Sequence, residues 1–464
     1  GHESTSNSIS STTNGLMYGI YSNSLSALNN TISNNTIANI TSTNASGSLN
    51  LVYGIYGLGT SLNTLSSNNI YNLKSSYKLT ASPGVIGINS AATTAGQTIS
   101  GNSIYNLTNT ETAAATSISG ISYSGTTTGT NSIEKNNIYN LMLSTNSTSG
   151  AINGITISGY PITVSNNMVR LGLASDASAI TTDYSIFGIK DAVTAGSTAF
   201  YFNSIYVGST SVSGVTSNTY AFSSAGTTNT RIIRNNIFSN VRSGGAAGKH
   251  FALGLAGVSS LINNNNDYFT GGSSTLAING ATEIASLSEL QTATSQDASS
   301  VSTNPNFINA TAATPNLKIN NSSSSLLEST GANITGITTD IEGDARPGPS
   351  GSSNGGAISS DIGADEFDGI PGKPIITLTS ASPNLTTQCS STARVITMDV
   401  ITAGTLTAAP ILSYSINGVA QTPINMTAGT GTLSSNGTWT ATIPTVTPAN
   451  GTVTWSVAAT LSLI

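Results

Sequence analysis

Gly101-Asn102-Ser103-Ile104-Tyr105-Asn106-Leu107 is the stretch around which the chain is organised, because versions of it recur at a nearly constant interval. Strong copies begin at Asn68 and Asn136, and weaker copies extend the series in both directions, with leading asparagines 30 to 37 residues apart. A second column, Gly-Ile and its variants, keeps a spacing of 33 to 35 residues over the same region. Two independent columns with one period predict a repeat architecture.

The composition indicates a folded, all-β protein with an uncharged polar surface. Asp, Glu, Lys and Arg make up 7% of the 464 residues, against about 25% in an average soluble protein. Hydrophobic residues make up 37%, which is more than a disordered chain usually carries. The net charge of -6, without clustered Lys and Arg, argues against nucleic acid or an anionic membrane as partner. No apolar run of about 18 residues exists, so no membrane insertion is expected, and the single cysteine, Cys389, excludes an intramolecular disulfide framework.

Residues 1 to about 275 predict a parallel β-helix with one coil per repeat. Each unit contains short β-type segments separated by clusters of Ser, Thr, Asn and Gly. A unit of about 33 residues cannot bury its apolar side alone and therefore needs stacked neighbours. A propeller and a leucine-rich repeat are the competitors, but a propeller usually has a longer period and the leucine-rich consensus is absent.

The repeated columns have expected positions in such a coil. The leading asparagines are expected at a turn, where asparagine tolerates left-handed backbone and its amide can bond the next coil. This structural ladder is predicted to comprise Asn35, Asn68, Asn102, Asn136, Asn166, Asn203 and Asn235. The aliphatic residues two positions later are expected to point inward, namely Ile37, Ile70, Ile104, Ile138, Met168, Ile205 and Ile237.

Residues 276–368 read as a capping segment in which the period fades. Ser286 to Ala293 is the one short helix expected, and it is a candidate cover for the open end of the stack. The segments Asp340-Ile-Glu-Gly-Asp-Ala-Arg-Pro347 and Asp361-Ile-Gly-Ala-Asp-Glu-Phe367 follow. In this order after the repeats, they resemble the closing coils of right-handed parallel β-helix proteins of the pectate-lyase-like superfamily, and more narrowly large secreted surface proteins of Bacteroidota. The resemblance covers about residues 15–368, and it implies a scaffold rather than an activity.

The expected domain organisation is therefore a β-helix over residues 1–368, a linker over 369–373 and a β-sandwich over 374–464. The last region contains alternating strands every 10 to 20 residues with turn signals such as Asn417-Gly418. It is similar to the immunoglobulin-like modules appended to such surface proteins. Because the chain stops in a strand-like segment, this module is expected to be truncated.

Acidic residues are concentrated between Asp340 and Asp368, which hold seven of the nineteen in the chain. Asp340, Asp344, Asp361 and Asp365 are the candidate ligands of a Ca²⁺ site, since calcium binds several carboxylate and carbonyl oxygens. The alternative is that these carboxylates cap turns and pair locally with Arg346. Apart from this possible ion, no cofactor is expected.

Tyrosine forms the most informative polar column. Tyr71, Tyr105 and Tyr139 occupy equivalent positions, and Tyr206 occurs later in the series. If the preceding isoleucine faces inward, strand alternation turns each tyrosine outward. Such a strip suits sugar rings or a protein partner. The alternative is that the rings pack beneath Ser/Thr-rich loops.

No catalytic residue is assigned. The charged residues of the repeat region do not supply the paired carboxylates that a glycosidase needs, and His250 reads as a solvated loop residue. The expected function is a non-catalytic, secreted or cell-surface rod that acts as an adhesin or structural element and binds glycans or surface and secretion proteins. Two alternatives stay open: a polysaccharide lyase or hydrolase, and a secretion-system cargo or surface-filament component.

Overall fold

The structure is a computed structural model that forms two compact units. It describes residues 8–461 except 14, 25–28, 44–49, 79–82, 113–114, 126–127, 212–215, 246, 272–274, 350–358, 383–391, 403–404 and 446–450. Cys389 therefore lies outside the described residues. The first unit comprises Gly1–Asn320, Gly331–Arg346 and Asp361–Glu366, and the second comprises Asn321–Thr330, Pro347–Ser360 and Phe367–Ile464. The exact domain boundaries expected from the sequence stay predictions.

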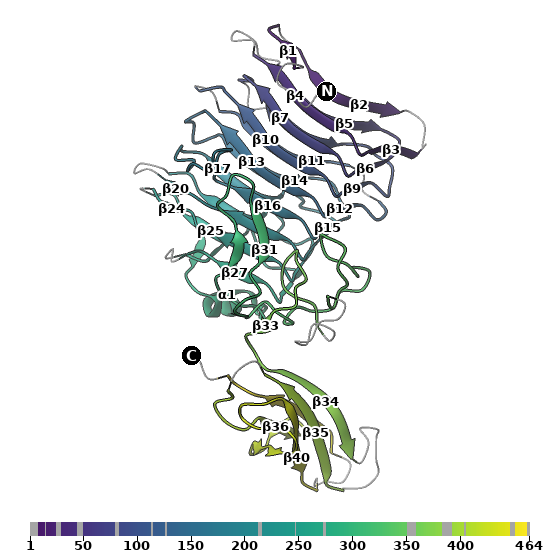
Figure 1. Cartoon of the computed structure of the whole chain (residues 1–464), viewed down its shortest axis with the longest axis vertical. Coiled ribbons are helices and arrows are strands. Elements are labelled where there is room, and N and C mark those ends of the chain that lie inside the picture. Colours follow the sequence, from purple (N-terminus) through teal and green to yellow (C-terminus); the bar gives the residue numbers. More distant parts are fainter. Residues whose placement is uncertain are drawn as a thin grey trace. The chain divides into compact units, whose positions relative to one another are not determined.

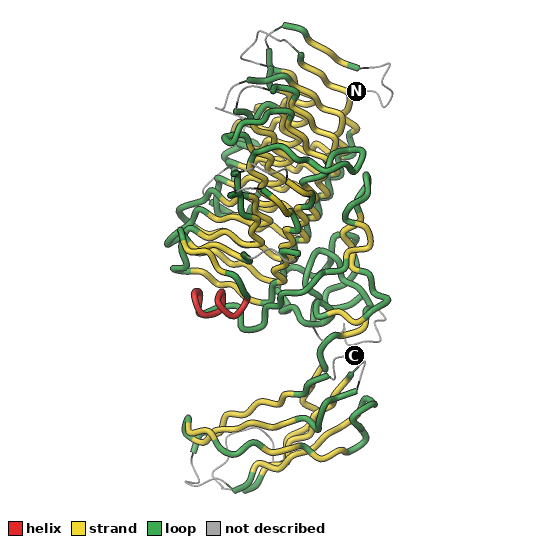
Figure 2. The backbone as a smooth tube through the Cα atoms, turned by 90° about the vertical axis from the view of Figure 1, so that its left-hand side faces the viewer, coloured by secondary structure: helices red, strands yellow, loops and turns green. Residues whose placement is uncertain are grey.

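The first unit contains a parallel β-solenoid of about seven turns, as the repeats predict (Figures 1 and 2). Each rung contributes one strand to each of three sheets, and all rung-to-rung pairings in these sheets are parallel except the terminal β28–β29 pair. Sheet A comprises β1 (Ile9–Ser11), β4 (Thr36–Ser42), β7 (Asn69–Ser75), β10 (Ser103–Asn109), β13 (Asn137–Leu143), β16 (Met168–Leu171), β19 (Ser204–Val207), β23 (Ile237–Asn240) and β27 (Asp267–Phe269).

The other two sheets complete each rung. Sheet B comprises β2 (Met17–Ser24), β5 (Val52–Gly59), β8 (Val85–Ser90), β11 (Ser117–Tyr123), β14 (Ala151–Ile157), β17 (Ser185–Asp191), β21 (Thr219–Ser224), β25 (His250–Leu255), β28 (Ala277–Asn279) and β29 (Thr282–Ile284). Sheet C comprises β3 (Asn29–Ser33), β6 (Leu62–Ser66), β9 (Thr98–Ser100), β12 (Ser132–Glu134), β15 (Ile162–Ser165), β18 (Ser197–Tyr201), β22 (Thr230–Arg234) and β26 (Leu261–Asn264). A minor pair, β20 (Thr210–Ser211) and β24 (Ser243–Gly244), joins two neighbouring loops.

Aliphatic columns from all three sheets fill the interior. The register of sheet A stacks Ile70, Ile104 and Ile138, each with no exposed surface. Burying such a side chain contributes about 1.5–3 kcal/mol. The glycine column of sheet B sits against this core: a Cβ at Gly120 would lie 2.6 Å from Cγ2 of Ile138. Glycine is therefore required there by close packing, as the repeat predicts.

The asparagine ladder is present at the turn between sheets C and A. From Asn35 to Asn236, each member donates from Nδ2 to Oδ1 of the asparagine in the next rung, over 2.9 to 3.0 Å. The same Oδ1 also accepts the backbone N–H of the preceding member, as in the pair formed by Asn102 and Asn136. The members are Asn35, Asn68, Asn102, Asn136, Asn167, Asn203, Asn236 and Asn266.

Two predicted members of the ladder were wrong by one residue. The position before each ladder asparagine has left-handed backbone, and Asn166 (φ 54°) and Asn235 (φ 61°) occupy it. In these two pairs the first asparagine takes the left-handed site, and Asn167 and Asn236 enter the ladder. The inward column shifts with them, so Val169 and Phe238 replace the expected Met168 and Ile237.

A short helix covers sheet B at the C-terminal end of the solenoid. Helix α1 (Leu287–Thr294), red in Figure 2, begins after Ser286, whose side chain accepts the N–H of Glu289. The Glu289 carboxylate in turn accepts the N–H of Ala285 at 2.8 Å. This reciprocal cap satisfies donors that a helix start leaves free. Leu290 is fully buried against the core, as expected for a capping element.

Residues 305–320, 331–346 and 361–366 of the first unit, which we call the closing segment, follow this helix. They contain the antiparallel pair β30 (Phe307–Asn309) and β31 (Asn316–Ile319). Leu317 and Ala364 of the closing segment pack with Met168 in a small cluster separate from the main core. The closing segment therefore returns onto sheet A.

The second unit contains small antiparallel sheets, which are compatible with the C-terminal β-module expected from the sequence. One sheet has the order β34-β35-β40-β39, while in the other β36 pairs with β37, β38 and β41. Leu412 from the second sheet and Trp439 from the first lie in one buried cluster. The strands are β34 (Ile375–Ser382), β35 (Arg394–Ile401), β36 (Ile411–Ile416), β37 (Val419–Ala420), β38 (Ile424–Asn425), β39 (Thr427–Ala428), β40 (Gly437–Ile443) and β41 (Val453–Ala458), and β32 (Ser324–Ser325) pairs with β33 (Ile370–Pro371). Among the described residues, no helix is long and apolar enough to cross a membrane.

The ladder predicts that alanine at Asn136 lowers the free energy of unfolding much more than alanine at the adjacent Asn137. Asn136→Ala removes a buried amide that serves Asn102, Asn167 and the carbonyl of Ile99. We expect a loss of about 2–4 kcal/mol in the free energy of unfolding, because buried partners lose their hydrogen bonds. Asn137→Ala, at a half-buried position outside the ladder, is the matched control and should cost less than about 1 kcal/mol. Urea unfolding of both variants measures this, and equal losses would contradict the assigned role of the ladder.

Candidate functional site

The tyrosine column lies on the outer face of sheet A. Tyr71, Tyr105 and Tyr139 are paired in register. Their ring centroids are 4.9 Å apart, and the planes of neighbouring rings differ by 5° and 2°. The column exists because Ile70 and its equivalents point inward, so the next residue points outward. The structure thus brings together three of the four predicted tyrosines.

The fourth tyrosine is separated from the stack by one rung. Arg170 occupies the position between Tyr139 and Tyr206, and Tyr206 contacts Phe307 instead, with centroids 6.2 Å apart. Tyr139 is 7% exposed, and burial raises its pKa to about 12. Tyr71 and Tyr105 are half-buried. Only this N-terminal part of the stack therefore meets solvent to a substantial degree.

A second row of asparagines runs beside the tyrosines. Asn39, Asn72, Asn106 and Asn140 all have left-handed backbone, with φ between 54° and 58°. From Asn72 on, each Nδ2 donates to Oδ1 of the asparagine in the preceding rung, over 3.0 to 3.2 Å. The amides of this outer asparagine row donate toward the N-terminal rungs, whereas those of the inner ladder donate toward the C-terminal rungs. This row was not predicted from the sequence, although the second asparagine of the Asn-Ile-Tyr-Asn-Leu motif marks it.

An open groove follows the outer asparagine row. Its volume is about 360 Å³, and it is lined by Ser8, Asn39, Thr41, Asn72, Leu73, Lys74, Asn106, Thr108 and Ser175. Most of these residues carry amides or hydroxyls, which both donate and accept hydrogen bonds. Lys74 is the one charged residue in this lining, and no carboxylate is among the lining residues. The groove can therefore bind a polar ligand, but its lining does not provide a pair of acidic catalysts.

The closing segment covers the remainder of this face. Asn140 donates to the carbonyl of Ala313 at 3.0 Å, and Arg170, which is fully buried, donates to the carbonyl of Ala312. Lys135 Nζ donates to Oγ1 of Thr339 at 2.8 Å. In Figure 1, β31 accordingly lies over the strands of sheet A. The groove is thus on the rungs that precede this cover.

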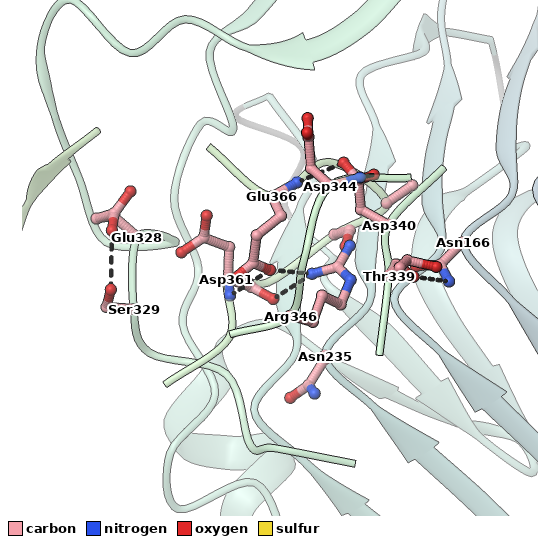
Figure 3. Close-up of polar contacts among 12 residues, drawn as sticks. Asn166, Asn235, Glu328, Ser329, Thr339, Asp340, Asp344, Arg346, Asp361 and Glu366 are labelled. Carbon is pink, nitrogen blue, oxygen red and sulfur yellow. Dashed lines mark hydrogen bonds and ion pairs between the residues drawn. The ribbon is translucent and has the colours of Figure 1, made fainter. Parts of the chain in front are cut away.

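Both asparagines that were misassigned to the ladder hold the closing segment. Asn166 Nδ2 donates to the carbonyl of Thr339 at 3.0 Å (Figure 3). Asn235 Nδ2 donates to the carbonyl of Ala332, and Asn235 Oδ1 accepts the N–H of Ala332. Left-handed backbone at these two positions turns the amides away from the inner ladder. They act as attachment points for the closing segment.

Only two of the four predicted calcium ligands come together. The carboxylates of Asp340 and Asp365 lie with that of Glu342 in a group whose oxygens are within 4.8 Å of one another. Asp344 is exposed in the same turn, and Asp361 is buried but lies outside this group. The acidic group therefore contains Glu342, which was not among the predicted ligands, and it lacks Asp344 and Asp361.

Local partners already occupy much of this acidic group. Oδ1 of Asp340 accepts the N–H groups of Glu342, Gly343 and Asp344 over 2.8 to 2.9 Å, and Oδ2 accepts the N–H of Glu366. Lys318 forms an ion pair with Glu342. These contacts favour the alternative of turn capping and local charge pairing, while calcium binding stays a prediction.

A buried ion pair secures the closing segment beside this group. Arg346 pairs with Glu366, and neither side chain has exposed surface. The guanidinium also donates to the carbonyl of Gly363 at 2.8 Å and lies 4.1 Å from the centroid of the Phe202 ring. The arginine that was expected to pair near Asp344 thus pairs with Glu366 instead (Figure 3).

His250 is a structural residue rather than the solvated one expected. It begins β25 and is 4% exposed. Nδ1 lies 2.9 Å from Oγ1 of Thr219, and Nε2 lies 3.1 Å from the carbonyl of Gly244. Burial lowers its pKa. Both ring nitrogens are therefore engaged in holding neighbouring loops together.

Comparisons with known proteins assign no family to the chain. No protein-family model matches it, and no match is found among curated proteins or among solved structures. Function is therefore inferred from the geometry of the outer face of sheet A.

The buried carboxylate of Asp365 predicts that stability falls as pH rises. Burial raises its pKa to about 6 from an ordinary 3.8, although the N–H of Ile319 and the charge of Lys318 act in the opposite direction. Between these two values the folded state holds a proton that the unfolded state has lost. The contribution of Asp365 thus decreases by about 3 kcal/mol from pH 4 to pH 6 and is constant above that range.

Asp365→Asn isolates this effect. The variant should become more stable relative to wild type as pH rises from 4 to 7, as measured by urea unfolding at each pH. Asp344→Asn removes an exposed carboxylate from the turn that begins at Asp340 and should leave the pH dependence of the free energy of unfolding as in wild type. If the free energy of unfolding of Asp365→Asn changed with pH as it does in wild type, Asp365 would not be the source of this pH dependence.

Proposed function

We propose that the chain is a non-catalytic, secreted or cell-surface rod that binds glycans through the groove on sheet A. The observation that carries this proposal is that the groove's asparagine row runs directly beside the tyrosine column. Amide side chains can satisfy both donors and acceptors of sugar hydroxyls. Aromatic rings with polar tips offer an apolar surface to the less polar parts of the same ligand.

The repeat of the surface supports a polymeric ligand. Successive rungs of a parallel sheet lie about 4.8 Å apart, and the groove presents Asn39, Asn72 and Asn106 in that sequence. Thr41, Lys74 and Thr108 form the parallel row on its other side. A chain of similar units can therefore repeat one set of contacts from rung to rung.

The resemblance noted in the sequence supplies the finer part of the proposal. We assign the solenoid to the right-handed β-helices of the pectate-lyase-like superfamily, of the kind found in Bacteroidota surface proteins. The C-terminal module is proposed to be immunoglobulin-like, and an adhesive role follows from the combination. A lyase or hydrolase is less well supported, because the groove lining holds no carboxylate. A role as secretion cargo or filament component stays an alternative.

A glycan array tests the proposal. Tyr105→Ala removes a ring next to the groove, and Asn106→Gly removes an amide while still allowing left-handed backbone. Each change should weaken binding about tenfold or more, which corresponds to about 1.4 kcal/mol.

Tyr201→Ala is the matched control, because Tyr201 is a half-buried tyrosine that ends β18 of sheet C. This variant should bind as wild type does. If Tyr105→Ala and Asn106→Gly both retain wild-type binding, the groove is not the glycan site.

A further inference from the structure

Four tyrosines gather on the outer face of sheet B, in its first two rungs. Tyr18 and Tyr21 lie on β2, and their register partners on β5 are Tyr53 and Tyr56. The Tyr18 and Tyr53 rings are stacked with centroids 5.3 Å apart, and the Tyr21 and Tyr56 rings with centroids 5.6 Å apart. The lateral pairs are separated by 5.0 Å and 4.9 Å. All four rings thus form one contact cluster, which we call the tyrosine quartet.

The repeat explains the orientation of the quartet but does not require it. In the sequence Tyr53-Gly54-Ile55-Tyr56 the isoleucine is fully buried, while Tyr56 is half-buried on the outer side. The next rung keeps Gly87 and Ile88 but has Ile86 and Asn89 in place of the tyrosines. The following rung has Ser119 and Ser122 at these positions. The three rungs after the quartet fold with Ile86, Ser119 and Asn153 in the first column, and aromatic rings return there only at Phe187. Individual rungs of the solenoid therefore do not need the aromatic rings.

The quartet has a fixed base and an exposed edge. Tyr53 is 8% exposed and packs with Leu51, Tyr77 and Ile86, which are also buried. Tyr21 is 49% exposed. A packed inner layer therefore holds the outer rings in place. A tyrosine side chain has few rotatable bonds, so a packed tyrosine offers a large contact area to a ligand at a low cost in conformational entropy.

The chemistry around the quartet is uncharged. Over the first five rungs, the two outward columns of sheet B contain tyrosine, isoleucine, serine, threonine and asparagine. A lysine first enters these columns at Lys190. The surface of these columns thus offers ring faces and neutral hydrogen-bonding groups, and Lys78, which follows Tyr77, forms an ion pair with Glu111. This distinguishes it from the groove on sheet A, whose lining includes Lys74.

We propose that the tyrosine quartet is a second binding site, which takes neutral sugar rings packed against Tyr21 and Tyr56. The apolar face of a pyranose ring contacts the aromatic rings, and the phenol hydroxyls and the Asn89 amide bind its hydroxyl groups. The site lies on a different sheet from the groove and uses none of the residues of that groove. Binding at the quartet can therefore be tested independently of binding in the groove.

Affinity electrophoresis of the full chain tests this proposal. Native gels would contain a soluble neutral polysaccharide, with a mixed-linkage β-glucan, a xylan and a galactomannan run separately. Wild type should be retarded by at least one of them. The double variant Tyr21→Ala, Tyr56→Ala should bind that polymer about tenfold more weakly, since aromatic contacts of this kind are each worth roughly a factor of two to ten.

Two further variants separate the possible causes. Tyr21→Phe, Tyr56→Phe keeps the rings and should retain most of the retardation, and an unchanged urea-unfolding midpoint of the Ala variant excludes loss of folding as the explanation. Tyr201→Ala, which lies outside both the quartet and the groove, should be retarded as wild type is. The proposal is overturned if no neutral polymer retards wild type, or if Tyr21→Ala, Tyr56→Ala is retarded as strongly as wild type. Neither of these results would exclude a charged glycan bound in the groove.

Discussion

The solenoid depends on one constraint: the amide groups buried at the turns between sheets C and A must all find hydrogen-bond partners. Stacking rungs in parallel removes the turn between sheets C and A from water, and an unpaired buried polar group costs about 1–3 kcal/mol. The inner asparagine ladder meets this demand, because each fully buried amide pairs with both neighbours, as Asn102 does with Asn68 and Asn136. The ladder ends at Asn266, whose N–H donates to Oγ of Ser300 at 3.0 Å. One interaction thus sets the register that the hydrophobic columns then fill.

The same register creates the surface on which the proposed functions depend. Alternation along β10 places Ile104 in the core and Tyr105 on the outer face, and the left-handed Asn106 adds an amide beside the ring. Repetition turns each of these residues into a row. The closing segment then covers the C-terminal part of this face, where the buried Arg346–Glu366 pair helps to hold it. What stays open is a short surface, and the quartet on sheet B lies near the same end of the solenoid.

The period and the asparagine motif were sufficient to predict the parallel solenoid, because both reflect contacts between equivalent residues of adjacent rungs. The errors at Asn166 and Asn235 arose where two asparagines adjoin, since the left-handed site and the ladder accept the same residue type. The return of the closing segment could not be predicted, because it depends on contacts such as Lys135 with Thr339, which are 204 residues apart and follow no period. The tyrosine quartet was visible as a repeated Tyr-Gly-Ile-Tyr, but only packing shows that its four rings touch.

The register of sheet A is tested most directly by paired spin labels. In a chain carrying Cys389→Ser, nitroxides would be attached at Ser103→Cys and Asn137→Cys, which are half-buried register partners on adjacent rungs. Labels about one rung apart, on the order of 5 Å, should give a spectrum dominated by spin–spin interaction. A control pair at Ser103→Cys and Ser288→Cys, the latter exposed on helix α1 and at least five rungs, or about 24 Å, away, should give the sum of its single-label spectra. If the in-register pair also gave only that sum, the rungs would not be stacked as described.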